Sequence, residues 1–170
     1  MTRRRKSSSS EPASQGLFAS HLVEQYEFPV YRCTLVREGT ISTEKRRVNS
    51  PEDAVTILEP QFTGADREKF LLLLLDARNQ VVGLNVATVG TLTETAVQPR
   101  EVFKPALLGL ATSIILAHNH PTGDPEPSPE DIATTKHLQE AGRILKIAVV
   151  DHLIIGDDGH WVSLARRGLL

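Results

Sequence analysis

Blocks of apolar residues, separated by short polar stretches, predict the strands of this chain. An unbroken apolar run, Phe70 to Leu75, is typical of a buried strand. The polar residues 76–80 then predict a turn, and residues 81–89 predict a second strand, so that the two form a central hairpin. Shorter apolar runs predict further strands at residues 30–36, 113–117, 148–155 and 161–165.

Three polar stretches carry the signature of a helix start. In Ser50-Pro51-Glu52-Asp53 a serine N-cap, a proline at the first position and acids in the first turn predict a helix that ends before Pro60. Gln98-Pro99-Arg100-Glu101 opens a second helix. Ser128-Pro129-Glu130-Asp131 repeats the first pattern and predicts a helix to about Leu145. Helices and strands in this order predict one mixed α/β domain.

The N-terminal part differs in composition from the rest. Residues 1–16 combine basic residues with a run of four serines, which predicts a disordered tail. Residues 17–49 are predicted to be an extension that contains the strand at 30–36. Residues 50–170 are predicted to form the folded domain.

Composition and charge exclude several classes of protein. The net charge of −2 offers no global attraction to nucleic acid or to an anionic membrane. No apolar stretch approaches the roughly 20 residues that span a bilayer, and the basic N-terminus lacks the apolar segment of a signal peptide. The single cysteine, Cys33, cannot form an internal disulfide. We therefore expect a cytoplasmic protein without a membrane partner.

The residues with the clearest chemical meaning are His118 and His120, which follow the apolar run 114–117. Side chains two residues apart on a strand share a face, so both imidazoles can point to one place. Asp131 follows in the first turn of a predicted helix. Two nitrogens and one carboxylate oxygen suit a zinc ion that keeps a fourth position open for water, as in catalytic sites.

A purely structural explanation exists for each of these residues. The histidines can be solvated loop residues, and Ser128 with Asp131 can be a helix cap that needs no metal. Ser50 and Asp53 show the same spacing with no histidines nearby. The combination of a strand end, a proline-rich loop and a helix start favours the metal site, because it brings three ligands together.

Hydrolysis at such a site needs a base that takes a proton from water and later hands it to the leaving group. Glu94 and Glu101 precede the histidines, whereas Asp124 and Glu126 read as solvated turn residues. Glu101 lies in the first turn of the helix before the histidine strand, from which its carboxylate could point at the metal. An acid in that turn also interacts favourably with the helix dipole, which would make Glu101 a surface residue without a catalytic role. The local sequence leaves these two explanations of Glu101 equally good.

The spacing His118-x-His120-Pro121-x6-Ser128-x2-Asp131 resembles the motif of the JAB/MPN (JAMM) metal-dependent hydrolases. From about residue 50 to residue 170 the chain resembles their RadC-like branch. The phrases that carry this resemblance are residues 90–92 (Gly-Thr-Leu), 99–103 (Pro-Arg-Glu-Val-Phe), 117–125 (Ala-His-Asn-His-Pro-Thr-Gly-Asp-Pro) and 151–156 (Asp-His-Leu-Ile-Ile-Gly).

The resemblance implies a cytidine-deaminase-like mixed sheet flanked by helices, with Zn²⁺ held by His118, His120 and Asp131. It also implies that Glu101, the best match to the family's glutamate, is the general base. Ser128 would support the oxyanion that forms when water attacks a carbonyl. His152 is expected either to support the site from behind or to be a structural residue bonded to backbone, and we do not count it among the ligands.

The resemblance favours a zinc-dependent hydrolase that cleaves an amide bond in a peptide or isopeptide substrate. One alternative is a DNA-metabolism factor with a structural metal, for which Arg3 to Lys6 and Arg166-Arg167 offer the basic residues. Residues 1–49 do not read as the helix-hairpin-helix region that usually precedes this domain, which weakens that alternative. A second alternative to the hydrolase is a non-catalytic scaffold of the same fold. The sequence indicates no oligomeric state.

Overall fold

The computed structural model describes residues 26–90 and 97–170. The predicted tail at 1–16 therefore lies outside the described residues. The helices are α1 (Pro51–Leu58), the short 3₁₀ turn η1 (Glu59–Gln61), α2 (Pro99–Leu108) and α3 (Pro129–Leu145). The strands are β1 (Lys69–Leu75), β2 (Val81–Val89), β3 (Ser113–Asn119), β4 (Ala148–Ile155) and β5 (Trp161–Ser163).

The five strands form one mixed sheet in the order β2-β1-β3-β4-β5. The β3–β4 pair is parallel, and the other three pairs are antiparallel. This arrangement confirms the mixed α/β domain. The hairpin of β1 and β2 is also confirmed, but its predicted place at the centre of the sheet is wrong for β2. β1 lies inside the sheet, whereas β2 forms an edge, because the chain returns through α2 to add β3 on the other side of β1.

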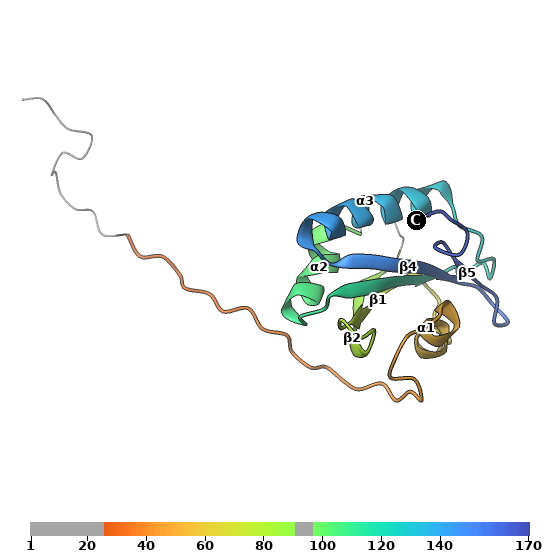
Figure 1. The fold of residues 1–170 in the computed structure, drawn as a ribbon, viewed down its shortest axis with the longest axis horizontal. Helices are drawn as coiled ribbons and strands as arrows, with labels where there is room; N and C mark the ends of the chain where they lie inside the picture. Colours follow the sequence, from red (N-terminus) through yellow and green to blue (C-terminus); the bar gives the residue numbers. More distant parts are fainter. Residues whose placement is uncertain (1–25, 91–96) are drawn as a thin grey trace, which may run out of the picture. The chain divides into compact units, whose positions relative to one another are not determined.

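Alternation along the strands divides the core into two layers (Figure 1). Leu71, Leu73 and Leu75 of β1 face α1, together with alternate residues of β3 and β4. Phe70, Leu72 and Leu74 face the opposite side, where α2 and α3 cover the sheet. Burial of both faces explains why β1 is apolar without interruption.

The prediction of a strand at residues 30–36 was wrong. These residues form no strand, and their side chains are exposed; that of Val30 is 98% accessible. A β-strand needs a neighbour to pair with its backbone groups, and apolar side chains alone do not provide one. Closer to α1, the chain pairs with the sheet at one isolated bridge, Arg47 with Gln80.

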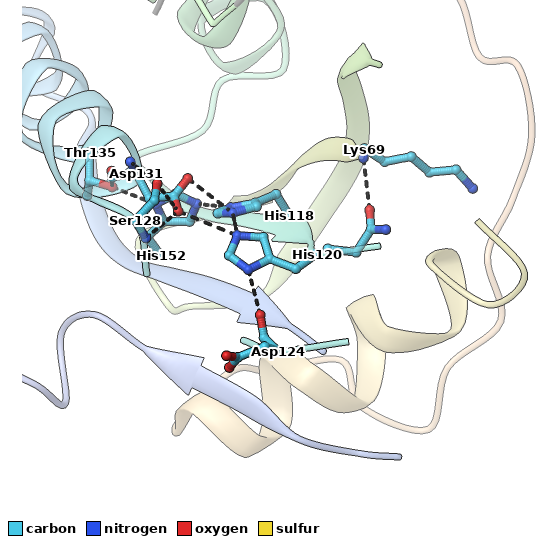
Figure 2. Close-up of polar contacts among 9 residues, drawn as sticks. Lys69, His118, His120, Asp124, Ser128, Asp131, Thr135 and His152 are labelled. Carbon is cyan, nitrogen blue, oxygen red and sulfur yellow. Dashed lines mark hydrogen bonds and ion pairs between the residues drawn. The ribbon is translucent and has the colours of Figure 1, made fainter. Parts of the chain in front are cut away.

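The end of β3 and the start of α3 lie together at one end of the sheet, and both are of functional interest. β3 runs towards the end of the sheet where β1 begins, because these two strands are antiparallel. The loop after β3 then leads into α3, whose first turn lies at the same end. Asn119 stabilises this end of the sheet, since its side-chain oxygen accepts a hydrogen bond from the Lys69 backbone N–H at 2.8 Å (Figure 2).

Candidate metal centre

Three side chains predicted as ligands converge where β3 ends and α3 begins (Figure 2). The Nε2 atoms of His118 and His120 are 3.0 Å apart. Asp131 Oδ1 lies 3.2 Å from His118 Nε2, and Asp131 Oδ2 lies 3.5 Å from His120 Nε2. The expectation that the two histidines share a face and meet Asp131 is thus confirmed as a geometric grouping.

The spacing and chemistry of these atoms fit a metal ion. A tetrahedral zinc site with ligand distances of about 2.0–2.1 Å separates neighbouring ligand atoms by about 3.3–3.4 Å. The separations of 3.0–3.5 Å between the three groups lie close to that value.

Asp131 serves as a helix cap and as a candidate ligand at the same time. Its Oδ2 accepts hydrogen bonds from the Ser128 N–H at 2.8 Å and the Ser128 hydroxyl at 2.7 Å. Ser128 Oγ in turn accepts from the Asp131 N–H at 3.1 Å, which completes a capping box. Because Oδ2 takes the capping bonds, Oδ1 remains directed at His118. The structural and the metal-site explanations are therefore compatible.

A backbone carbonyl orients His120. Its Nδ1–H donates to the Asp124 carbonyl at 2.6 Å, which leaves Nε2 directed at the site (Figure 2). The loop that supplies this carbonyl is held at two further points. Gly123 O accepts from the Asp157 N–H at 3.0 Å, and Glu126 pairs through both carboxylate oxygens with Arg167. Asp124 thus contributes through its backbone, a role that its side chain could not indicate.

A second buried histidine lies behind His118. His118 Nδ1 and His152 Nε2 are 2.8 Å apart, and neither ring is more than 1% exposed. Phe70 packs against both rings, with centroid distances of 6.2 Å to His118 and 5.4 Å to His152. Desolvation, with a smaller contribution from His118, lowers the pKa of His152 well below its ordinary value. The ring of His152 therefore contacts side chains. Of the two predicted alternatives, a structural residue bonded to backbone was wrong.

The electrostatics of the group follow from burial and mutual contact. Burial by itself raises the pKa of the Asp131 carboxyl, but the contacts with His118, His120 and Ser128 outweigh it and lower the pKa far below its ordinary value. Asp131 in turn raises the pKa of His120, against the opposing effect of burial. Asp131 is therefore an anion at neutral pH, and His120 holds a proton more firmly than an ordinary histidine.

This raised pKa predicts how metal binding depends on pH. A metal ion must displace the proton from His120 Nε2, so affinity should fall as pH decreases, beginning above the ordinary histidine pKa of about 6.5. Zinc titration against a competing chelator, corrected for the chelator's own protonation, measures the effect. A zinc affinity that is constant across the titration range of histidine would contradict it.

Glu101 lies in the first turn of α2 and is paired with basic residues. Its carboxylate contacts Lys104 Nζ at 2.8 Å and Arg100 Nε at 3.6 Å, and its side chain is 43% exposed. Lys104 lowers the pKa of this carboxyl. Among the described residues, the group that could hold a metal consists of His118, His120 and Asp131 without Glu101. Glu94 lies outside the described residues.

Glu68 is a carboxylate that the sequence analysis missed. β1 and β3 pair Phe70 with His118, and continuing that register by two residues places Glu68 opposite His120. Glu68 is partly buried, and its charge contributes to the raised pKa of His120, after the larger effects of Asp131 and the Asp124 carbonyl. The available signal was a carboxylate two residues before a buried aromatic, on the same face of the strand.

Comparison with known proteins agrees with the architecture. A family model described as RadC-like JAB domain matches residues 48–169. The chain belongs to the RadC-like JAB domain family. Relatives include UPF0758 proteins of Methanosarcina mazei (44% identical over 133 residues) and Moorella thermoacetica (49% over 134). These alignments cover 78% and 79% of this chain, but 58% of each relative. The chain thus spans little more than half of their length, and their names state no activity.

Proposed function

We propose that this RadC-like domain is a zinc-dependent hydrolase that cleaves an amide bond in a peptide or isopeptide-like substrate. The observation that carries the proposal is the convergence of His118 Nε2, His120 Nε2 and Asp131 within 3.0–3.5 Å. Three protein ligands of this kind are typical of catalytic zinc, whereas structural zinc has four. Zinc bound there would lower the pKa of water and polarise a carbonyl.

The proposed reaction needs a carboxylate base, and two glutamates compete for that role. Glu101 is the candidate from family resemblance, but its carboxylate is engaged with Lys104 and Arg100. Glu68 is supported by its place opposite His120 and by its electrostatic effect on that ring. We propose Glu68 as the base. It would take a proton from the attacking water and donate it to the departing amine.

Ser128 has two proposed roles that use the same proton. Its hydroxyl donates to Asp131 Oδ2 at 2.7 Å, which supports a role in holding this ligand. The role inferred from family resemblance, donation to an oxyanion, would require the hydroxyl to turn away from Asp131. A serine hydroxyl has one hydrogen to donate, so the two roles would alternate during turnover.

The DNA-binding alternative has less support. Of the basic residues that suggested it, Arg166 pairs with Glu52 at 2.7 Å and Arg167 with Glu126 at 2.7 Å. Arg3 to Lys6 lie outside the described residues. Because Arg166 and Arg167 are already paired with acids, we keep hydrolysis as the one proposed activity.

None of the helices in the described residues has the length and apolar character of a membrane span.

The test combines metal analysis with turnover. The purified chain is loaded with zinc, measured for metal content, and assayed on a panel of peptides and lysine-linked isopeptides. We expect one zinc per chain and cleavage of at least one amide, abolished by a chelator and restored by zinc. Full zinc occupancy without turnover on the whole panel would count against catalysis and favour the scaffold alternative.

A further inference from the structure

Thr135 and His152 form a buried pair that leads away from the metal centre (Figure 2). We propose that they are positioning residues that fix the tautomer of His118, so that its Nε2 lone pair always faces His120 and Asp131. The inference deepens the proposed function and rests on the same site.

The direction of these hydrogen bonds is set first by the Asp131 backbone carbonyl, which can only accept. The backbone carbonyl of Asp131 lies 2.6 Å from Thr135 Oγ1, one helical turn further along α3. The single hydroxyl hydrogen of Thr135 must point to this carbonyl, because otherwise two acceptor oxygens would face each other. Thr135 Oγ1 therefore accepts at its other contact, from His152 Nδ1 at 2.5 Å.

The direction then passes through His152 to His118. With its hydrogen on Nδ1, a neutral His152 carries a lone pair on Nε2. That atom is 2.8 Å from His118 Nδ1, so His118 donates from Nδ1. The two rings are buried side by side, which disfavours a positive charge on His152. His118 Nε2 is left as a lone pair 3.2 Å from Asp131 Oδ1.

Both metal-facing histidines thus take their tautomer from a carbonyl oxygen. His120 bonds directly to Asp124 O, whereas His118 is connected to Asp131 O through two side chains. The second route also links two of the three candidate ligands, since it begins at the Asp131 carbonyl and ends at His118. Partners of this kind orient metal-binding histidines, and their loss typically lowers metal affinity about 10- to 100-fold.

The test replaces the hydroxyl that sets the direction. Thr135→Val keeps the shape of the side chain but removes the acceptor for His152, and Thr135→Ser is the matched control that retains it. The tautomers of His118 and His152 are read from ¹⁵N NMR of the metal-free chain at alkaline pH, where the imidazoles are neutral. Zinc affinity of each variant is measured separately by chelator competition.

We expect His118 in the Nδ1–H form in the wild type and in Thr135→Ser. Thr135→Val should shift His118 towards the Nε2–H form and weaken zinc binding roughly 10- to 100-fold. His152→Gln, whose amide can accept from His118 and donate to Thr135, should bind zinc more tightly than His152→Leu. The proposal is overturned if Thr135→Val keeps both the His118 tautomer and the zinc affinity of the wild type. Failure of the wild type to bind zinc would instead refute the proposed function, because the tautomers are read without metal.

Discussion

Replacing Glu68 with glutamine is expected to reduce amide hydrolysis by roughly 100- to 10,000-fold, the usual contribution of a positioned acid or base. Glutamine keeps the size of the side chain but cannot accept and return a proton. Zinc affinity should change little, because Glu68 is not one of the three grouped ligands. Steady-state rates and zinc affinity measured on the same preparation separate these two effects.

Glu101→Gln provides the decisive comparison, since Glu101 is the base that family resemblance favours. If Glu68 is the base, Glu101→Gln should lose far less activity, because its carboxylate is held by Lys104 and Arg100. Glu130→Gln, an exposed acid in the first turn of α3, is the matched control. Near-normal rates in Glu68→Gln with a large loss in Glu101→Gln would refute our assignment.

The second large effect is expected from His120→Ala. This variant removes one of three candidate ligands, so zinc affinity should fall by more than about 100-fold, beyond the usual cost of losing an outer partner. Hydrolysis should be lost in parallel. His120 is the best choice among the ligands because its side chain is 15% exposed, whereas that of His118 is fully buried. Its removal therefore leaves a smaller void in the core than the removal of His118 would.

His137→Ala supplies the control for that experiment. His137 lies on α3, the helix that carries Asp131, and it is exposed. Circular dichroism of both variants checks that the fold is retained. We expect His137→Ala to match the wild type in zinc affinity and rate. Unchanged zinc binding in His120→Ala would mean that the zinc is held by other residues.

Much of the fold could be predicted because local chemistry specifies it. Ser50 and Ser128 both cap helices by accepting the N–H three residues later, as their spacing predicts. The apolar run of β1 is buried on both faces. The grouping of the three candidate ligands could also be predicted, because His118 and His120 are two residues apart and Asp131 follows at a helix start.

The remaining features depend on contacts between distant parts of the chain. Glu68 gains its significance from the register of β1 against β3, which no local pattern contains. The contact of His152 with His118 joins residues 34 positions apart. The strand predicted at residues 30–36 failed for the converse reason, since those residues have the right composition but no paired neighbour.

The most direct test of the central claim is a crystal structure of the zinc-loaded chain, with anomalous diffraction recorded at the zinc absorption edge. We predict one anomalous peak, bonded to His118 Nε2, His120 Nε2 and Asp131 Oδ1, with Glu68 within reach of the open coordination position. A zinc ion bound by other residues, or no peak at this triad under saturating zinc, would contradict the account.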